Sequence, residues 1–381
     1  MFMGQGYVYL SGGIFFLLAY PYAIYPLLLW CLSSFKSPSG FIVDRSALPK
    51  VSLILSVYNE EKVIDAKIDN FINLEYPTDR IEFLIVSDGS NDQTDQLVTN
   101  RQQKAIQLIR QGREGKTAAL NRAVEQSNGD ILVFTDANTF FAPDAILKLV
   151  APFTDSSVGL VSGLVLPLGS ESGEGLFGRF ETYLKGRESA LGLIAGADGA
   201  IYALRRCLYT PLAPRIINDF IHPMKSVIAG YRSVLAQDAI AYEESEDDLD
   251  REFFRQKRMV TQAFAIVREM LPVLISAGQF GLVWVLVSHK LLRWLHVPLM
   301  GLFLTCSILL FMTNGSSIYL LPAVLYMSVS VVGKLLSSTR KRLPIIDLLY
   351  KFQLVHLAYF FGVVESIKGR SAVVWNPRGG S

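Results

Sequence analysis

The chain has 381 residues, of which 51% are hydrophobic and only 18% are charged, and its mean hydropathy is +0.33. A soluble domain is nearer a quarter charged, so this composition argues against an ordinary soluble protein and indicates that part of the chain sits in lipid. The net charge of +2 says little about partners, and we expect no nucleic acid among them. Cys31, Cys207 and Cys306 are far apart and follow no metal-binding spacing, so we interpret them as reduced structural residues of a cytosol-facing protein.

Residues 1–36 contain an apolar stretch that is long enough for a membrane helix of about 20 residues. The start MFMGQG has no charge, unlike the basic start of a signal peptide, so we favour a membrane anchor. Pro21 and Pro26 are expected to kink it. Lys36 and Arg45 follow the span, and positive charge after a span predicts that this side faces the cytoplasm.

Residues 45–250 alternate short apolar β-type runs with helical patterns. The expected strands lie within 51–61, 83–94, 106–109 and 130–138, and the helices between them within 61–74, 93–105 and 115–127. Strands that alternate with helices predict a parallel sheet. After residue 151 the pattern becomes less regular, with a strand or hairpin at 158–169, a helix at 176–192, and strands within 196–206 and 236–245.

Beyond residue 250 the chain becomes apolar again. We expect amphipathic or interfacial helices over 251–290, membrane helices over 291–368, and a tail over 369–381. Within the second of these ranges, 297–311 and 318–332 are plausible spans and 345–364 is a weaker one. The basic loop at 340–342 is expected on the cytoplasmic side, and the number of spans stays open.

Two carboxylates close apolar β-type runs with turn chemistry, Asp88 in VSDGSND and Asp136 in FTDAN. Parallel sheets bind ligands at this carboxyl edge. A hard divalent cation prefers oxygen ligands such as Asp136, together with phosphate oxygens, and Asn138 could add a weaker oxygen ligand. The alternatives are ordinary turn chemistry for Asp88 and a helix cap for Asp136, whereas a functional Asp88 could accept the imide N–H of a pyrimidine base.

Further polar residues suggest a phosphate site and a base. Lys116 opens a helix, where it could reinforce the attraction for phosphate or simply be a solvated surface group. Asp219 could be a general base or a helix N-cap. Arg255 and Arg258 share a helix face and could hold a diphosphate, lie on the bilayer surface, or do both. Dinucleotide and Walker glycine patterns are absent, which argues against dinucleotides and P-loop chemistry.

In this order, the motifs resemble the membrane-bound family 2 glycosyltransferases with a GT-A fold, the superfamily of the cellulose, chitin and hyaluronan synthases. The matching segments are SVYNEE (56–61), VSDGSND (86–92), GKTAALN (115–121), FTDAN (134–138), GADGAIYALRR (196–206), NDF (218–220), RQKRM (255–259) and VVWNPR (373–378). The resemblance covers roughly residues 50–270 well. It implies an α/β catalytic domain with a Rossmann-like mixed sheet, flanked by transmembrane and interfacial helices.

The resemblance implies an inverting hexosyl- or N-acetylhexosaminyltransferase that takes a nucleotide-sugar, most often UDP-linked, with Mg²⁺ or Mn²⁺. Asp219 would match the base that deprotonates the acceptor hydroxyl. The donor would contact Tyr58, Glu60, Asp88, Lys116, Asp136, Arg255, Arg258 and Trp375, the acceptor would contact Gly196, Asp198 and Met259, and the metal would be held by Asp136 and Asn138.

The chain departs from the family pattern at four places, one of which is Arg255, where the helix motif usually has Gln. The metal motif is D-A-N instead of D-x-D, Asn218 replaces the acid that commonly precedes the base, and Met259 stands where the helix motif usually has Trp. An aromatic face stacks on a sugar better than a thioether does, so the last change puts chain elongation in doubt.

Three functions remain open on this basis. The first is a synthase that makes and exports a polysaccharide, as the spans on both sides of the catalytic domain suggest. The second is the transfer of a single sugar to a lipid or lipid-linked acceptor, which the altered RQKRM motif favours. The third is a catalytically silent membrane scaffold or carbohydrate-binding subunit, which the intact Asp88, Asp136, Asp219 and Arg258 argue against.

Overall fold

The computed structural model describes residues 2–35, 45–101, 103–168, 175–244, 248–337 and 343–370. Lys36, the basic loop at 340–342 and Trp375, on which sequence expectations rest, lie outside these residues. The chain forms two compact units. The sheet unit consists of Leu29–Ser245 with Ile266–Val285, and the helix unit consists of Met1–Leu28, Glu246–Ala265 and Leu286–Arg370.

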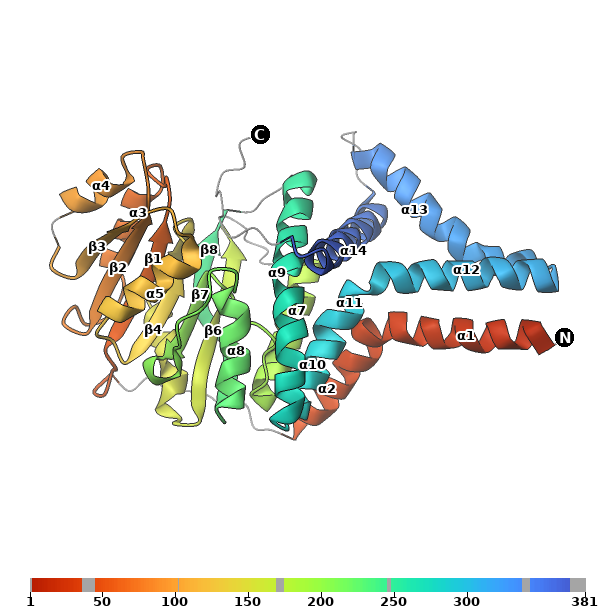
Figure 1. Cartoon of the computed structure of the whole chain (residues 1–381), viewed down its shortest axis with the longest axis horizontal. Helices are drawn as coiled ribbons and strands as arrows, with labels where there is room; N and C mark the ends of the chain where they lie inside the picture. The colour runs from red at the N-terminus through yellow and green to blue at the C-terminus, as the bar shows by residue number, and fades with distance from the viewer. Residues whose placement is uncertain are drawn as a thin grey trace. The chain divides into compact units, whose positions relative to one another are not determined.

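One mixed sheet of eight strands organises the sheet unit (Figure 1). Its strands are β1 Val51–Val57, β2 Ile81–Asp88, β3 Ile106–Gln111, β4 Ile131–Thr135, β5 Thr139–Phe141, β6 Val158–Pro167, β7 Ile201–Arg205 and β8 Arg232–Glu243. They are ordered β3-β2-β1-β4-β7-β6-β8-β5. The first four strands in the chain pair in parallel, as the sequence predicts, whereas β7 runs antiparallel to both β4 and β6. The fold is therefore α/β with a mixed sheet, and β6 is one strand and not a hairpin.

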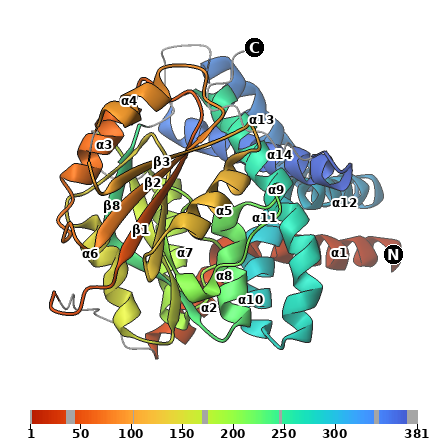
Figure 2. The same cartoon turned by 60° about the vertical axis from the view of Figure 1, so that its left-hand side comes forward.

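Helices cover both faces of the sheet. They are α3 Ile64–Ile72, α4 Thr94–Asn100, α5 Lys116–Gln126, α6 Ala145–Val150, α7 Leu176–Leu191, α8 Asn218–Ile228 and α10 Phe280–Val285. Alternate residues of β1 explain the arrangement: Leu53 and Leu55 pack with α3 and α6, whereas Ile54 packs with α5 on the other face. Figure 2 shows α3 and α5 on opposite sides of the parallel strands. Because both faces of β1 are buried, its sequence is continuously apolar and not alternating.

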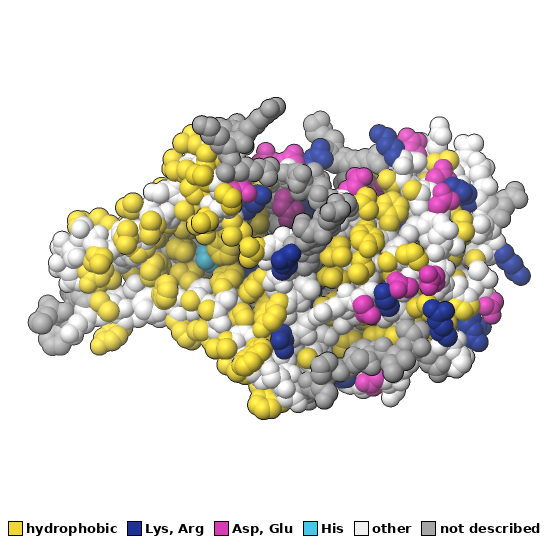
Figure 3. Space-filling view, turned by 180° about the vertical axis from the view of Figure 1, so that it is seen from behind, with side chains coloured by type: hydrophobic (Ala, Val, Ile, Leu, Met, Phe, Trp, Pro, Cys, Tyr) yellow, Lys and Arg dark blue, Asp and Glu magenta, His cyan; other side chains and the backbone are white. Residues whose placement is uncertain are grey.

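Long apolar helices make up most of the helix unit. They are α1 Phe2–Ala19, α12 His296–Asn314, α13 Leu321–Ser337 and α14 Pro344–Ile367, with the short α11 Leu292–Trp294. α1 and α12 lie side by side (Figure 1), and Phe15 meets Phe303 with ring centroids 6.0 Å apart. Hydrophobic side chains cover much of the face of these helices in Figure 3, whereas charged side chains are spread over the sheet unit. Exposed apolar side chains on this scale indicate a lipid environment.

Four helical stretches among the described residues are long and apolar enough to cross a membrane: Gln5–Ser34, Leu249–Ser276, His296–Asn314 and Ser317–Ser337. The first agrees with the predicted anchor. A π-helical turn at Tyr20–Ile24, between α1 and α2 Tyr25–Ser34, interrupts it at Pro21, one of the two expected kink positions. The third and fourth agree with the expected spans. The weaker expected span corresponds to α14, which is not among the four.

The segment expected to be interfacial has a different organisation. Its first part belongs to α9 Leu249–Ser276, a continuous helix of 28 residues that contains Pro272 and is itself a candidate span. α9 stops before Gly278, whose φ of +71° a residue with a side chain rarely adopts, and α10 follows. Residues 251–285 thus lie in two helices joined by a short turn, and a π-helical turn, Leu286–Leu291, follows; that these helices lie at the membrane interface stays a prediction.

Candidate active site

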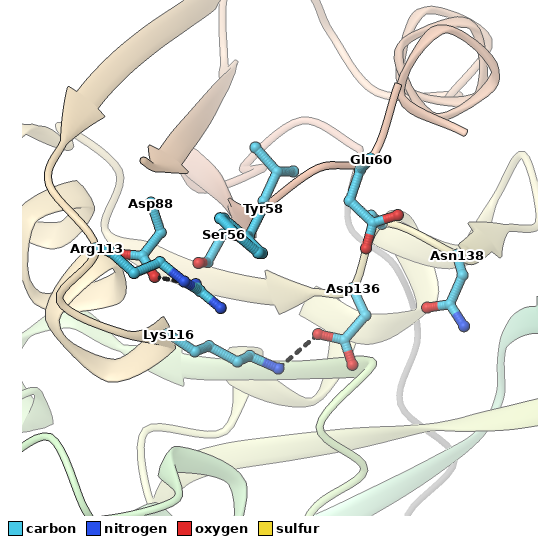
Figure 4. A pocket seen from close by; sticks show the side chains of 10 residues that line it. Ser56, Tyr58, Glu60, Asp88, Arg113, Lys116, Asp136 and Asn138 are labelled. Carbon is cyan, nitrogen blue, oxygen red and sulfur yellow. Dashed lines mark hydrogen bonds and ion pairs between the residues drawn. The ribbon is translucent and has the colours of Figure 1, made fainter. Parts of the chain in front are cut away.

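A polar pocket lies at the carboxyl ends of β1, β2 and β4 in the sheet unit (Figure 4). The chain runs from β1 outward through β2 to β3 and then returns to β4 on the other side of β1. Loops on the two sides of β1 therefore diverge, and the sheet opens a crevice at this switch point. The pocket is lined by Ser56, Val57, Tyr58, Glu60, Asp88, Arg113, Lys116, Asp136, Ala137 and Asn138.

One end of the pocket is formed by Tyr58, Asp88 and Arg113. The Arg113 guanidinium lies 3.4 Å from the centroid of the Tyr58 ring and donates to Asp88 Oδ2 at 2.5 Å. Asp88 is buried, and its oxygens also accept from Gln111 Nε2 and from the backbone N–H groups of Glu114 and Gly115. Asp88 thus holds the distant loop that opens α5, a role that neither of its sequence interpretations predicted. A contact from Asp88 to a base stays a prediction.

The loops after β1 and β2 hold each other in place. Asn59 adopts a left-handed φ of 55°, and its side chain accepts from the backbone N–H of Asn91 at 2.9 Å. The backbone N–H of the buried Glu60 donates to Thr94 Oγ1 at 2.8 Å. A non-glycine residue in this region costs energy and marks a locally constrained backbone. The motifs SVYNEE and VSDGSND therefore act as one structural element that positions Tyr58 and Glu60.

The other end of the pocket contains the ion pair between Lys116 and Asp136. Lys116 Nζ donates to Asp136 Oδ1 at 2.5 Å, and the two side chains are 33% and 36% exposed. Lys116 is the first residue of α5, after Gly115 with a φ of 97°. A helix N-terminus with an adjacent lysine is suited to bind an anion. Asp136 does not cap a helix, because the chain after it turns into strand β5.

The residues of the D-A-N motif fit a divalent cation that is coordinated by protein oxygens and phosphate oxygens together. No group of three His, Cys, Asp or Glu side chains in the described ranges could hold a metal by itself. Asp136 supplies one accessible carboxylate, and Mg²⁺ and ions like it are often bound by one or two carboxylates plus substrate phosphates and water. The amide of Asn138 donates to Glu243 Oε1 at 2.7 Å. An aspartate at position 138 would face this glutamate, which explains why an amide replaces the second acid.

Asp219 lies in the first turn of α8 and close to three other charged groups. Burial raises the pKa of Asp219 to about 6; the charge of Lys116 lowers it, and those of Asp198 and Asp136 raise it. The carboxylate lies against the backbone of Gly199, where a methyl group added to the glycine would stand 3.0 Å from Asp219 Oδ2. The N-cap residue is Ile217, so Asp219 is not the helix cap that was its alternative. The structure therefore brings the candidate base into the neighbourhood of Lys116 and Asp136.

Asn218, just before the base, is part of a buried hydrogen-bond chain. Its amide donates to the Tyr202 hydroxyl at 2.5 Å, and this hydroxyl pairs with His222 Nδ1 at 3.0 Å. Tyr202 in turn stacks on Phe134 of β4, with centroids 4.7 Å apart. Burial lowers the pKa of His222 to about 3, so the ring is neutral. These uncharged hydrogen-bonding groups tie the start of α8 to the sheet. They hold the first turn of α8, which carries Asp219, although Asn218 stands where the family commonly has an acidic residue.

Residues 52–193 match the model of the family described as glycosyl transferase family 2. This chain carries a family 2 glycosyltransferase domain. The probable glycosyltransferase YdaM of Bacillus subtilis is 35% identical to the chain over 127 residues, which are 32% of the chain and 30% of that protein. A beta-monoglucosyldiacylglycerol synthase of Trichormus variabilis is 32% identical over 122 residues, 31% of the chain and 26% of that protein. A poly-beta-1,6-N-acetyl-D-glucosamine synthase of Staphylococcus aureus is 29% identical over 124 residues, 32% of the chain and 30% of that protein.

The chain thus spans about 30% of the length of the curated relatives it matches. Among solved structures, the mannosyltransferase PcManGT from Pyrobaculum calidifontis, in complex with GDP-Man and Mn²⁺, has a TM-score of 0.70 and 23% sequence identity. That similarity covers 95% of this chain and 100% of the other. It shows that the glycosyltransferase domain has the GT-A fold that the resemblance predicted.

Several expected site residues of the glycosyltransferase are not part of the pocket. Arg255, Arg258 and Met259 belong to α9 in the helix unit, where Arg255 pairs with Glu252 at 2.7 Å and Met259 is 42% exposed. Gly196 and Asp198 lie in the loop before β7, and the backbone N–H of Asp198 donates to Ser162 Oγ at 2.9 Å. Their contacts with donor or acceptor, like that of Trp375, stay predictions.

Sequence reasoning missed Arg113 and Lys67, which both approach the site. Arg113 carries a weak signal, since it stands three residues before the predicted phosphate lysine. Lys67 could have been recognised from its spacing in the sequence, because it lies on the same helix face as the apolar residues Ile64, Ile68 and Phe71. A lysine on the buried face of a helix next to the sheet requires a polar partner inside.

Replacing Gly199 by alanine is expected to lower kcat about 10-fold or more, because the new methyl group would push the Asp219 carboxylate away from its position. The KM for the donor and the melting temperature are expected to change little, since a side-chain carboxylate can move. Steady-state kinetics of UDP release measure the effect. Gly112→Ala is the matched control, because no atom lies within 4 Å of the added carbon there. Unchanged kcat in Gly199→Ala would show that this contact does not place the base.

Proposed function

We propose that the protein transfers a sugar from a nucleotide-sugar to an acceptor hydroxyl at a membrane, with inversion at the anomeric carbon. The observation that carries this proposal is the grouping of Lys116, Asp136 and Asp219 at the switch point of a family 2 glycosyltransferase domain. An anion site, a carboxylate for a cation and a carboxyl with a raised pKa are the three groups that such a displacement needs.

The nucleoside binds at the end of the pocket formed by Tyr58, Asp88 and Arg113. Tyr58 offers an aromatic face, which Arg113 covers in this structure at 3.4 Å. A base that stacks there displaces or joins the guanidinium, and Glu60 lines the same pocket toward Asp136 and Asn138 (Figure 4). We propose UDP-sugars as the first donors to test, because the resemblance favours uridine, and GDP-mannose as the second, because PcManGT was solved with it.

The diphosphate binds between Lys116 and Asp136. Mg²⁺ or Mn²⁺ would be held by Asp136, with a contribution from Asn138 through its oxygen, and would neutralise charge on the leaving diphosphate. Lys116 then exchanges part of its contact with Asp136 for the phosphate. Arg258 matches the arginine of the family's helix motif, so the resemblance supports it as a further donor residue, with Arg255 on the same helix face. Electrostatic stabilisation of this leaving group is the largest expected contribution to the rate.

Asp219 acts as the general base. It takes the proton of the acceptor hydroxyl while the hydroxyl oxygen attacks the anomeric carbon from the face opposite the leaving group. The bond from that carbon to the diphosphate oxygen breaks, and its electron pair leaves with the diphosphate. A carboxyl with a pKa of about 6 is ionised at neutral pH yet more basic than an ordinary aspartate, which suits it to this step.

Two acceptor classes remain for this transferase. A growing polysaccharide is supported by the candidate spans on both sides of the domain and by the similarity to poly-beta-1,6-N-acetyl-D-glucosamine synthase. Transfer of a single sugar to a lipid is supported by Met259 at the position of the family's tryptophan and by the similarity to beta-monoglucosyldiacylglycerol synthase. In both cases we propose that the sheet unit faces the cytoplasm, where nucleotide-sugars are made, in keeping with Arg45 after the first span.

Incubation of the detergent-purified protein with UDP-sugars or GDP-mannose, Mn²⁺ and candidate lipid acceptors tests the proposal. Release of the nucleoside diphosphate with a high-mass product supports polymer synthesis, and release with a single-sugar glycolipid supports the second acceptor class. Asp219→Asn is the negative control. No release from any donor by folded protein would argue for the scaffold function.

A further inference from the structure

A lysine is buried beneath the loop that carries the metal-binding residues. Lys67 of α3 is 1% exposed and is among the largest fully buried side chains of the described residues. Its Nζ donates to Thr135 Oγ1 at 2.8 Å and to the backbone carbonyl of Thr139, and it lies 4.8 Å from the centroid of the Phe141 ring. Lys67 therefore contacts the chain on both sides of the segment 136–138, which contains Asp136 and Asn138.

A second residue of α3 binds the end of strand β5, which follows this segment. Asn70 Nδ2 donates to the carbonyl of Phe141 at 2.8 Å, and the backbone N–H of Phe141 donates to Asn70 Oδ1 at 2.8 Å. This pair of bonds satisfies both backbone groups of one residue in β5. Lys67 and Asn70 lie three residues apart and so share a helix face. One face of α3 thus forms hydrogen bonds with Thr135, before the D-A-N turn, and with Thr139 and Phe141, after it.

Stability alone does not account for a lysine here. Burial lowers the pKa of Lys67 to about 7, whereas the charge of Asp136 raises it, so the folded protein holds the charged form at a cost. A leucine or methionine would fill a similar volume among Ile64, Ile68 and Phe71 without that cost, but only the lysine donates to Thr135 and Thr139 on the two sides of the D-A-N turn. A mobile D-A-N turn, on the other hand, could not present its oxygens in a constant geometry.

We propose that Lys67 and Asn70 form a positioning clamp that holds Asp136 and Asn138 in the geometry required by a divalent cation and the donor diphosphate. The inference rests on the proposed function of this site as a metal-assisted transferase. Neither residue touches substrate, so both are positioning residues. The clamp acts from beneath the loop, and the ligand approaches from the opposite, pocket side.

The substitution Lys67→Met tests the clamp. Its matched control is Lys62→Met, because Lys62 is an exposed lysine just before α3. Removing a group that orients a metal ligand is expected to weaken Mn²⁺ binding in the presence of UDP about 10- to 100-fold. Binding is measured by electron paramagnetic resonance of free Mn²⁺, with GDP as the alternative nucleotide. In kinetics, kcat is expected to fall more than the donor KM rises.

Amide hydrogen exchange of the peptide covering 136–141 provides a readout that needs no metal. Exchange is expected to speed up in Lys67→Met and in Asn70→Ala, and to stay unchanged in Lys62→Met and Asn73→Ala. Asn73 is the control for Asn70, because its amide bonds only within the same helix end, to the carbonyl of Asp69. Unchanged exchange and unchanged Mn²⁺ affinity in Lys67→Met would overturn the clamp.

Thr135 supplies a second pair of variants in case Lys67→Met does not fold. Thr135→Val removes the hydroxyl that accepts from Lys67 and is expected to reproduce the loss, whereas Thr135→Ser keeps it and is expected to behave like wild type. The double variant Lys67→Met/Thr135→Val is expected to be no worse than Lys67→Met alone, because both changes break one contact. Wild-type protein that binds no Mn²⁺ with either nucleotide would count against the proposed function, while hydrogen exchange would still decide the clamp.

Discussion

Replacing Asp219 by asparagine is expected to lower kcat for sugar transfer by at least about 100-fold, because the amide cannot take the acceptor proton. Asparagine has the same shape, and Gly199 leaves the same space beside it. Donor binding is expected to persist, so the KM for the donor should change little. Steady-state release of UDP measures the effect. Asp79→Asn, an exposed turn residue before β2, is the matched control. An Asp219→Asn enzyme that turns over at the wild-type rate would refute the base assignment.

The same substitution is expected to raise the melting temperature at about pH 8 and to raise it about half as much at about pH 5. The folded-state pKa of Asp219 is raised to about 6 from the ordinary 3.8, so the folded protein binds this proton more tightly than the unfolded chain. The contribution of Asp219 to the free energy of unfolding is thus greatest below about pH 4, and it is lost as the pH rises to about 6. Since each pKa unit corresponds to about 1.4 kcal/mol, the ionised carboxylate costs up to about 3 kcal/mol.

Asparagine removes that cost in full above about pH 6, where folded wild-type Asp219 is charged, and only in part between about pH 4 and 6, where the unfolded chain ionises but the folded carboxyl still holds its proton. Thermal melts of both proteins at the two pH values, with Asp79→Asn alongside, measure the difference. If Asp219→Asn gains equally at both pH values, the gain does not come from the charge.

The second large effect is expected at Asp136. Asp136→Ala should reduce transfer by about 100-fold or more and make added Mn²⁺ ineffective, because Asp136 lines the pocket and is the carboxylate that we propose as the metal ligand. Wild-type protein stripped with EDTA should lose its activity to a similar extent and recover it with Mn²⁺ or Mg²⁺. The alanine also removes the carboxylate that pairs with Lys116 at 2.5 Å, so the activity lost in this variant combines two causes.

Two controls separate these effects. Lys116→Met keeps Asp136 and is expected to retain Mn²⁺ binding in the presence of UDP while weakening donor affinity, since we propose that the lysine charge contacts the diphosphate. Asp79→Ala is expected to match wild type in every assay. Metal-independent transfer by EDTA-treated protein would contradict the assignment of Asp136 as the metal ligand.

Local sequence patterns predicted a large part of the sheet unit. Strands β1, β2, β3 and β4 were recognisable because each is a short apolar run that ends in turn residues, and the helices between them have apolar residues at helical spacing. The same patterns placed Asp88 and Asp136 at strand ends. The helix-cap alternative for Asp136 was wrong, because β5 follows the D-A-N motif and no local signal distinguishes a three-residue strand from the start of a helix.

Other features depend on contacts between distant residues. The insertion of β7 between β4 and β6 in antiparallel orientation brings Gly199 and Asp198 next to Asp219, and pairing partners cannot be read from a strand's own residues. The continuity of α9 through Pro272 was also unexpected, since proline usually ends or kinks a helix. In both cases packing from elsewhere in the chain outweighs the local preference.

The sequence by itself determined the α/β class, the alternation of strands and helices, the apolar spans and the order of the chemical residues, because these follow from short-range periodicity and turn chemistry. Only the tertiary structure decided which polar residues meet. It showed Asp88 engaged by the loop before α5, Arg113 against Tyr58, and Lys67 bonded to Thr135 next to Asp136. The physical reason is that burial and pairing of a charge depend on neighbours that are 20 to 80 residues away in the chain, roughly the separations of Asp88 from Arg113 and of Lys67 from Thr135.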